Sequence, residues 1–180
     1  RADAVVLTRS DLVTDDRRQA IASILKNIKP SLPIAEAVHL PVELIACNGG
    51  EGEPGGSAGR HYCGTGDDPA RLRRRKVLLF SGLGNPEGFE LTAASLGWQI
   101  AAHYRFRDHH RYFDHELSEL QKRAEDAGCD AVVTTEKDIV KIGGCWRHPM
   151  PLYALAVRFE IRQGYDALNE LLSSILAAYP

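Results

Sequence analysis

The sequence lacks the features that mark several specialised classes of protein. Its four cysteines include no C-x-x-C pair, so a disulfide-stapled scaffold is excluded and reduced thiols are expected. No apolar run approaches the roughly 18 residues that a membrane-spanning helix needs. The 22 basic and 24 acidic residues give a formal net charge of -2, so no overall attraction for nucleic acid is encoded.

Two further absences concern nucleotides and the start of the chain. The phosphate-binding loop G-x-x-x-x-G-K-[ST] occurs nowhere in the 180 residues, which argues against nucleotide hydrolysis by this chain alone. The chain begins with Arg1 rather than Met, and an apolar run starts at Ala4 without a lead-in. We therefore expect a piece of a longer protein.

Apolar runs rich in β-branched residues alternate with stretches of helical period, which is typical of parallel strands joined by crossover helices. The sequence predicts one α/β domain over residues 1–180, with a mostly parallel sheet of about five or six strands and helices on both faces. We expect strands at 4–8, 37–46, 76–80, 99–106 and 131–134 and a half-exposed edge strand after Pro151. Helices are expected at 15–28, after an Asn85 cap, after an Asp114 cap and at the C-terminal end.

One segment interrupts this pattern. Residues 48–69 hold eight of the 16 glycines together with two prolines. Such a composition favours a flexible insertion over a strand or helix.

Ligands of open α/β sheets bind beyond the carboxyl ends of the strands, so polar residues just after strands are the first candidates. The first such cluster is G-L-G-N-P-E-G, which contains Gly82, Gly84, Asn85 and Gly88. It stands between a strand and a helix, as a phosphate-binding turn does. However, the third glycine is one position late for a dinucleotide fingerprint, so a capped strand-to-helix turn is the competing interpretation.

The second cluster is Asp108-His109-His110, which follows the strand expected at 99–106. A carboxylate beside an imidazole can fix its tautomer and raise its basicity, so proton transfer is the natural role. In the competing interpretation one histidine caps the next helix and the other is solvated. Histidines and cysteines stand at no ligand spacing along the chain, so no metal site is expected.

The third cluster, T-T-E-K-D at 134–138, includes Lys137 and Asp138 and is followed by Lys141. It could contact a phosphate or an ammonium group of a ligand, or form a helix cap with solvated charges. Separately, the stretch at 71–76 holds five basic residues in six positions. It could touch anionic lipid headgroups or protect the following apolar strand from aggregation.

Taken together, these clusters resemble one family, the tetraacyldisaccharide 4'-kinases of lipid A biosynthesis. The resemblance covers nearly all of this chain but only about the C-terminal half of the family's length, with the motifs in the same order and at fitting separations. The matching stretches are R-A-D-A-V-V-L-T-R at 1–9, F-S-G-L-G-N-P-E-G-F at 80–89, F-R-D-H-H-R-Y at 106–112 and T-T-E-K-D-I-V-K at 134–141.

The resemblance implies a membrane-associated P-loop kinase that transfers the γ-phosphate of ATP, with Mg²⁺, to the 4'-hydroxyl of a tetraacyldisaccharide 1-phosphate. The phosphate loop and the metal-binding acids would belong to the N-terminal half of the family. We therefore expect this chain alone to be inactive and to bind neither ATP nor Mg²⁺ tightly. The implied partners are the glycolipid, the N-terminal P-loop half and an anionic membrane surface, with no nucleic acid.

The resemblance also implies roles for single residues. His109 would pair with an aspartate of the N-terminal half and help to deprotonate the attacking hydroxyl, with Asp108 orienting it and His110 behind it. Arg9 would face the nucleotide phosphates. Gly82, Gly84, Asn85, Lys137 and Asp138 would shape the substrate site or the structure around it.

The long stretch at 48–69 indicates a lineage-specific insertion. The expected location is the cytoplasmic face of the bacterial inner membrane, or a mitochondrion if the source is eukaryotic. Two alternatives remain open on the sequence: a non-catalytic α/β module that binds a nucleotide or a lipid, and a small Rossmann-like oxidoreductase that uses Gly82, Gly84 and Gly88.

Overall fold

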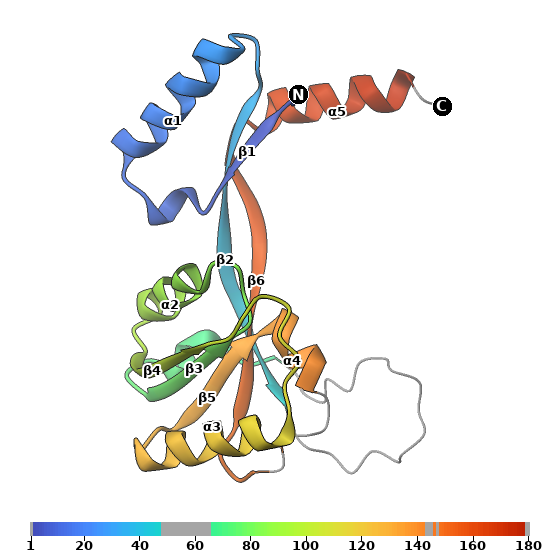
Figure 1. Cartoon of the computed structure of the whole chain (residues 1–180). Helices are drawn as coiled ribbons and strands as arrows, with labels where there is room; N and C mark the ends of the chain where they lie inside the picture. The colour runs from blue at the N-terminus through green and yellow to red at the C-terminus, as the bar shows by residue number, and fades with distance from the viewer. Residues whose placement is uncertain (1, 48–65, 143–145, 147, 179–180) are drawn as a thin grey trace. The chain divides into compact units, whose positions relative to one another are not determined.

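A computed structural model of the chain describes residues 2–47, 66–142, 146 and 148–178 (Figure 1). The chain divides into two compact units. Unit 1 comprises Arg1–Leu40 and Arg158–Pro180, and unit 2 comprises Pro41–Val157. Two long strands, β2 (Ile34–Cys47) and β6 (Leu152–Gln163), contribute residues to both units. The candidate residues at 82–88, 107–112 and 134–141 all belong to unit 2.

Unit 1 contains β1 (Val5–Thr8), the short 3-10 helix η1 (Ser10–Leu12), α1 (Asp15–Ile28) and α5 (Tyr165–Ala178). Strand β1 pairs in parallel with the beginning of β2, with Val5 opposite Ile34. The sequence correctly predicts the bounds of α1, but neither α1 nor α5 has a single buried residue. Ile28 of α1 is 77% exposed. The apolar stripe of each helix is therefore only partly covered within the described part of the chain.

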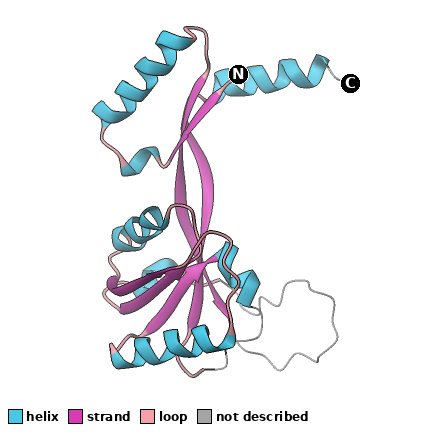
Figure 2. Cartoon of the chain, in the orientation of Figure 1, coloured by secondary structure: helices cyan, strands magenta, loops and turns pink. Residues whose placement is uncertain are grey.

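Unit 2 contains β3 (Lys76–Ser81), β4 (Gln99–Arg105) and β5 (Ala131–Thr135), together with parts of β2 and β6 (Figure 2). Strand β3 pairs in parallel with β4 and with β5, and β5 pairs in parallel with β6. The six strands of the sheet follow the order β1-β2-β6-β5-β3-β4. The expected mostly parallel α/β sheet is confirmed.

Helices cover both faces of the sheet in unit 2. Alternate residues of β3 point to opposite faces, and the two sets of side chains pack against different helices. Leu78 and Phe80 belong to one buried cluster, with side chains of α3 (Asp114–Asp126) and α4 (Glu136–Ile142). Val77 and Leu79 belong to a second cluster, with side chains of α2 (Pro86–Ser95) and of the 3-10 helix η2 (Pro69–Leu72). This two-sided packing fixes the carboxyl ends of β3, β4 and β5, from which the candidate site residues follow.

The helix starts show which local signals were sufficient. Asn85 caps α2 as expected, since its side-chain oxygen accepts the backbone N–H of Gly88 at 3.0 Å, and Pro86 is the first helical residue. The expected Asp114 cap is wrong. Asp114 is the first residue of α3 and Phe113 holds the cap position, because the Glu116 carboxylate reaches back to accept the Phe113 N–H at 3.0 Å.

Two other expectations need correction. The strand after Pro151 is not an edge strand, since β6 lies between β2 and β5 and its first five residues are all buried. The glycine-rich segment expected at 48–69 lies mostly outside the described residues. Its described end is ordered by contacts: Asp67 and Leu44 exchange two backbone hydrogen bonds of 2.7 and 2.9 Å, and Pro69 begins η2.

Candidate functional site

The structure brings together residues that follow three neighbouring strands. Gly82 follows β3, Asp108 lies in the loop after β4, and Lys137 and Asp138 lie in α4 directly after β5. These strands are parallel, so their carboxyl ends meet at one edge of the sheet. The three sequence clusters therefore meet at one edge of the sheet in unit 2, where ligands of open α/β sheets bind, and form one candidate site.

Asp138 is the buried anchor of this site. Its side chain is 0% exposed and accepts hydrogen bonds from the Gly82 backbone N–H at 3.0 Å and the Thr135 hydroxyl at 2.8 Å. Lys141 supplies the compensating charge at 2.9 Å. Because a buried carboxylate is stable only when paired and hydrogen-bonded, this arrangement holds the ends of β3 and β5 together. Asp138 thus shapes the structure and has no oxygen directed to solvent.

Gly82 lies where no side chain fits comfortably. A Cβ atom there would be 3.1 Å from the Asp138 Oδ1 and 3.2 Å from both the Arg107 carbonyl oxygen and the Tyr112 hydroxyl. Burial and the nearby Asp138 carboxylate raise the pKa of Tyr112 well above its ordinary value, so the phenol stays protonated. Its buried hydroxyl has no hydrogen-bond partner within the described residues. A side chain at position 82 would therefore fit only if the neighbouring atoms shifted by a few tenths of an ångström.

Asp108 forms the solvent-facing part of the site. Its carboxylate accepts a hydrogen bond from Lys137 at 2.7 Å and from the backbone N–H of His109 at 3.0 Å. The Lys137 ammonium lowers the pKa of Asp108 below its ordinary value. Gly84 lies against the same carboxylate, since a Cβ atom there would be 3.5 Å from Asp108 Oδ2. Asp108 is therefore an anion held in place from two sides.

His109 occupies an unusual backbone conformation at the tip of this loop. Its φ of 61° lies in the left-handed region, which residues other than glycine rarely adopt and which is enriched at functional sites. Its side chain is 77% exposed, and its Nε2 lies 3.8 Å from Asp108 Oδ2. That distance is longer than a hydrogen bond. Asp108 thus orients the backbone of His109, while the imidazole is presented to solvent near the carboxylate.

His110 has a structural role beside them. Its Nε2 lies 2.9 Å from the Glu116 carboxylate, and its ring stacks on Phe106 with 4.6 Å between the ring centres. The ring also meets the edge of Tyr112. His110 therefore fixes the loop after β4 to the start of α3, behind the exposed His109.

Arg9 is the one predicted site residue that belongs to unit 1. It follows β1 with a φ of 55° and is half buried. The other seven, including the cap residue Asn85, belong to unit 2. Within the described residues, no group of three His, Cys, Asp or Glu side chains could hold a metal ion.

Sequence reasoning placed Thr135 and Lys141 in the same cluster as Lys137 and Asp138, but it assigned no role to either of them or to Tyr112. Thr135 and Lys141 flank Asp138 at i-3 and i+3, a spacing that brings their side chains together at the start of a helix. Tyr112 gave no such signal, since its contact with Gly82 and Asp138 depends on the folded loop.

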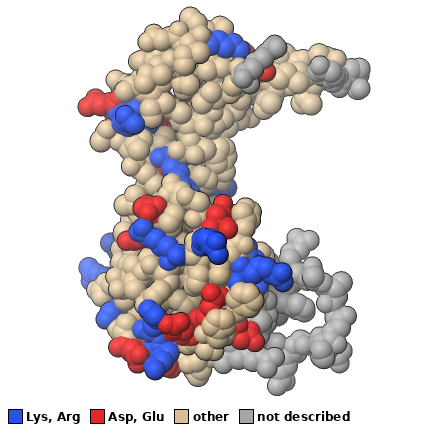
Figure 3. All heavy atoms as spheres, in the orientation of Figure 1, with Lys and Arg blue, Asp and Glu red and all other residues tan. Residues whose placement is uncertain are grey.

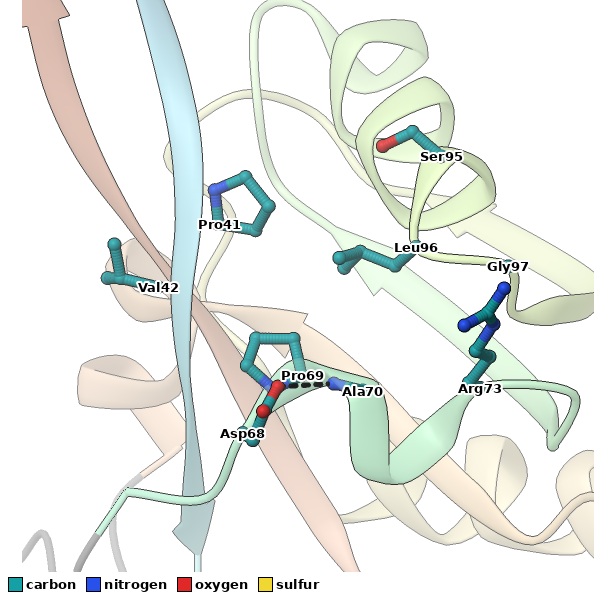
Figure 4. A pocket seen from close by; sticks show the side chains of 9 residues that line it. All are labelled: Pro41, Val42, Asp68, Pro69, Ala70, Arg73, Ser95, Leu96 and Gly97. Atoms are coloured by element: carbon teal, nitrogen blue, oxygen red, sulfur yellow. Dashed lines mark hydrogen bonds between the residues drawn. The ribbon is translucent and has the colours of Figure 1, made fainter.

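A separate hollow of about 650 Å³ lies at the opposite edge of unit 2 (Figure 4). Arg73 and Gly97, which line it, precede β3 and β4, whereas the candidate site residues follow these strands. In Figure 4 the Arg73 side chain extends towards Gly97, and Asp68 is bonded to the Ala70 N–H. None of the predicted site residues lines this hollow.

Charged side chains of both signs are interspersed over the face of unit 2 seen in Figure 3. Three of the five basic residues at 71–76 have partners: Arg71 pairs with Asp67, Arg75 with Asp130, and Lys76 with the Ala127 carbonyl. No helix among the described residues is long and apolar enough to cross a membrane.

Comparisons with known proteins agree with the motifs. Residues 1–177 match the sequence model of the family described as tetraacyldisaccharide-1-P 4'-kinase. A tetraacyldisaccharide 4'-kinase of Anaeromyxobacter sp. strain Fw109-5 is 33% identical over 177 residues, which are 98% of this chain and 43% of the relative. The enzyme of that name from Syntrophus aciditrophicus is 30% identical over 132 residues, which are 73% of this chain and 32% of the relative.

Among solved structures, LpxK from Aquifex aeolicus, crystallised in complex with ATP, has a TM-score of 0.44 and 19% identity over 96% of this chain and 51% of that chain. The chain thus spans less than half the length of the curated relatives that it matches. The match of the family model over nearly the whole sequence establishes that this chain belongs to the tetraacyldisaccharide-1-P 4'-kinase family.

Proposed function

We propose that this chain forms part of a kinase that transfers the γ-phosphate of ATP to the 4'-hydroxyl of a tetraacyldisaccharide 1-phosphate. The observation that carries the proposal is the exposed His109 imidazole, held in a strained turn beside Asp108 at the carboxyl edge of the sheet. Membership of the kinase family supports it. A strained residue that the surrounding contacts hold in place is a frequent feature of active sites.

Phosphoryl transfer requires positioning, charge neutralisation and a base for the attacking hydroxyl. In the proposed mechanism, His109 accepts the proton of the sugar hydroxyl directly or through a carboxylate of the remainder of the kinase. Asp108 fixes the His109 backbone through a 3.0 Å hydrogen bond and places its carboxylate beside the imidazole. Lys137 holds Asp108 in place and keeps it ionised.

We propose that protein outside this chain supplies the phosphate-binding loop and the ligands of Mg²⁺. The 180 residues contain no G-x-x-x-x-G-K-[ST] loop, and the described residues contain no cluster suited to a metal ion. Arg9, after β1, is proposed to contact the nucleotide phosphates from unit 1. The chain alone is therefore proposed to be inactive.

The N-terminal P-loop half that the family resemblance implies is the proposed partner. The exposed apolar residues of α1 and α5, such as Ile28 and Leu176, support this proposal because partly uncovered stripes of this kind mark interaction surfaces. The face of unit 1 in Figure 3 also carries few charged side chains. The relatives are more than twice as long as the part that this chain matches.

The substrate is a glycolipid, so the complete kinase is proposed to act as a peripheral protein on an anionic membrane surface. The proposed location is the cytoplasmic face of a bacterial inner membrane, or a mitochondrion for a eukaryotic source. The basic stretch at 71–76 is the proposed contact, although Arg71, Arg75 and Lys76 already have protein partners. Arg73 and Arg74 are the residues available for headgroups.

A chimera tests the function directly. The preceding part of the Anaeromyxobacter relative is fused to this chain, and phosphorylation of the disaccharide lipid is measured with Mg²⁺-ATP. The chain alone is expected to be inactive and the chimera active. His109→Ala should lower the rate at least about a hundredfold, as loss of a base or its partner does, whereas His115→Ala, an exposed histidine of α3, should have little effect. An active chimera that is indifferent to His109→Ala contradicts the proposed role.

One observation disfavours a dinucleotide oxidoreductase. The backbone N–H of Gly88, at the start of α2, already donates to the Asn85 side chain. It is therefore not free for a pyrophosphate group, which such enzymes bind at this position.

A further inference from the structure

Three side chains of unit 2 form a continuous hydrogen-bonded relay beside the candidate site. Ser81 at the end of β3 lies 2.9 Å from the Nε2 of His103 on β4. The Nδ1 of the same ring lies 3.0 Å from the Glu90 carboxylate on α2. The relay therefore joins the three elements that surround the glycine turn at 82–85.

The relay runs from the buried sheet to the surface. Ser81 is 0% exposed and the His103 side chain 3%, whereas the Glu90 side chain is 37% exposed. Arg105 donates to Glu90 at 2.7 Å and to Glu87 at 2.6 Å. The inner end is thus sealed from water, and the outer end is fixed by an ion pair.

Electrostatics select one protonation state of the relay. Burial lowers the pKa of His103, so its ring is neutral at neutral pH. The hydrogen bond from Arg105 and, to a smaller extent, the one from His103 lower the pKa of Glu90, so this carboxylate is ionised. An ionised carboxylate only accepts, so Nδ1 carries the proton and Nε2 accepts from the Ser81 hydroxyl. This leaves the Nδ1–H tautomer.

The order hydroxyl, imidazole, carboxylate is also that of a hydrolase triad. Burial decides against a nucleophilic role here, since no external substrate can reach an oxygen of a residue that is 0% exposed. The role that remains for the relay is structural. The contacts of Ser81 identify the segments that the relay keeps in position.

Ser81 stands between the two segments of the candidate site. Its carbonyl oxygen accepts the backbone N–H of Phe106 at 2.9 Å, two residues before Asp108. The next residue, Gly82, donates its N–H to Asp138. Strand β4, which carries His103 and Arg105, continues directly into the loop with His109. A substitution in the relay would therefore alter the positions of both the glycine turn and the His109 loop.

We propose that His103 is a positioning residue which, as the Nδ1–H tautomer, links Ser81 to Glu90 and holds the glycine turn and the Asp108-His109 loop in the geometry required for reaction. The catalytic consequence rests on the proposed kinase function, but the relay itself does not. His103 acts through its neighbours and contacts no substrate.

The relay is tested first on the full chain by nitrogen-15 NMR of the His103 ring at neutral pH. The expected spectrum has a protonated Nδ1 and an unprotonated Nε2, and Ser81→Ala should shift the Nε2 signal while leaving Nδ1 protonated. A protonated Nε2 as the main form, or an Nε2 signal unmoved by Ser81→Ala, overturns the proposal. This readout requires no enzymatic activity.

Amide hydrogen exchange tests the positioning. Ser81→Ala and His103→Gln should accelerate exchange at the Gly82 and Phe106 amides about fivefold to tenfold, which corresponds to the loss of one net hydrogen bond. The matched control is Ser95→Ala, which removes a hydroxyl that bonds only within its own helix at Thr92. Equal exchange at both amides in Ser81→Ala and Ser95→Ala overturns the proposal. Ser81→Ala changes little volume, so it remains informative if His103→Gln does not fold.

In the active chimera, Ser81→Ala and His103→Gln should lower kcat about tenfold or more and leave the KM for ATP unchanged, because the reacting geometry is displaced. An unchanged kcat refutes the catalytic consequence. An inactive chimera with the expected NMR and exchange results contradicts the proposed function and leaves the relay supported.

Discussion

The Lys137 ammonium lies 2.7 Å from the Asp108 carboxylate and joins the start of α4 to the loop after β4. The two residues are 29 positions apart in sequence, and neither is buried. Their contact sets the ionisation of Asp108 and fixes the loop from which His109 projects.

Lys137→Gln should raise the pKa of Asp108, because the ammonium that stabilises the carboxylate is removed. In the unaltered chain the folded-state pKa lies below the ordinary value of 3.8. The pair therefore stabilises the fold at pH values above the ordinary pKa of 3.8. This contribution is lost as the pH falls through the lower folded-state pKa. Carboxyl titration by NMR measures the shift. Lys122→Gln, an exposed lysine of α3, is the control, and an Asp108 titration equal in both variants contradicts the ion pair.

The His109→Gly variant should be more stable to unfolding than the His109→Ala variant. Its φ of 61° costs a residue with a Cβ atom about 1 kcal/mol or more relative to glycine. His109→Gly should therefore exceed His109→Ala in free energy of unfolding by about 1 kcal/mol, as measured by urea titration. At Lys122, in the interior of α3, the order should be reversed: the Ala variant should be more stable than the Gly variant, since glycine is about 1 kcal/mol less favourable than alanine in a helix. The same order at both positions would show that His109 is not held in the left-handed region.

Asp138→Ala should be among the most destabilising changes in unit 2. It leaves the Gly82 N–H without its acceptor and Lys141 without its counter-ion, and breaking a pair of this kind costs about 3 kcal/mol. Urea unfolding measures the loss, and Asp126→Ala at the exposed end of α3 should cost almost nothing. Adding Lys141→Met should recover part of the loss. Costs that simply add in the double variant would argue against coupling of the two charges.

Gly164, between β6 and α5, should tolerate no side chain. Its φ is 74°, and a methyl group there would overlap the Ile34 carbonyl oxygen and lie 2.9 Å from the Ala35 Cα. Gly128 has a similar φ of 64° but open space around it. Gly128→Ala should cost about 1 kcal/mol, the conformational cost alone, and Gly164→Ala clearly more. Equal losses on thermal or urea unfolding would contradict the close contact in unit 1.

Local signals in the sequence were sufficient for most elements. The bounds of α1 were predicted as observed, and Asn85 and Pro86 marked the start of α2. Helical periodicity, capping residues and continuous apolar runs act within a few positions, so they can be read without the fold. The order of motifs also identified the family that the comparisons show.

The local signals failed where two candidates competed or where distant segments meet. Asp114 and Phe113 both precede a helical run, and the reach of the Glu116 side chain decided the start of α3. The strand after Pro151 alternates like an edge strand, yet its neighbours on both sides make it an internal one. Alternation describes one strand, whereas its place in a sheet depends on which strands pair with it.

The sequence alone determined the α/β class, the strand and helix pattern and the three polar clusters, because these depend on residues close together in the chain. Only the tertiary structure decided that Asp138 is buried with Lys141 and Gly82, that Lys137 pairs with Asp108, and that Ser81, His103 and Glu90 form a relay. Their partners come from different strands and helices. Burial and hydrogen bonding between such elements are set by the packing of the whole sheet, which no local pattern encodes.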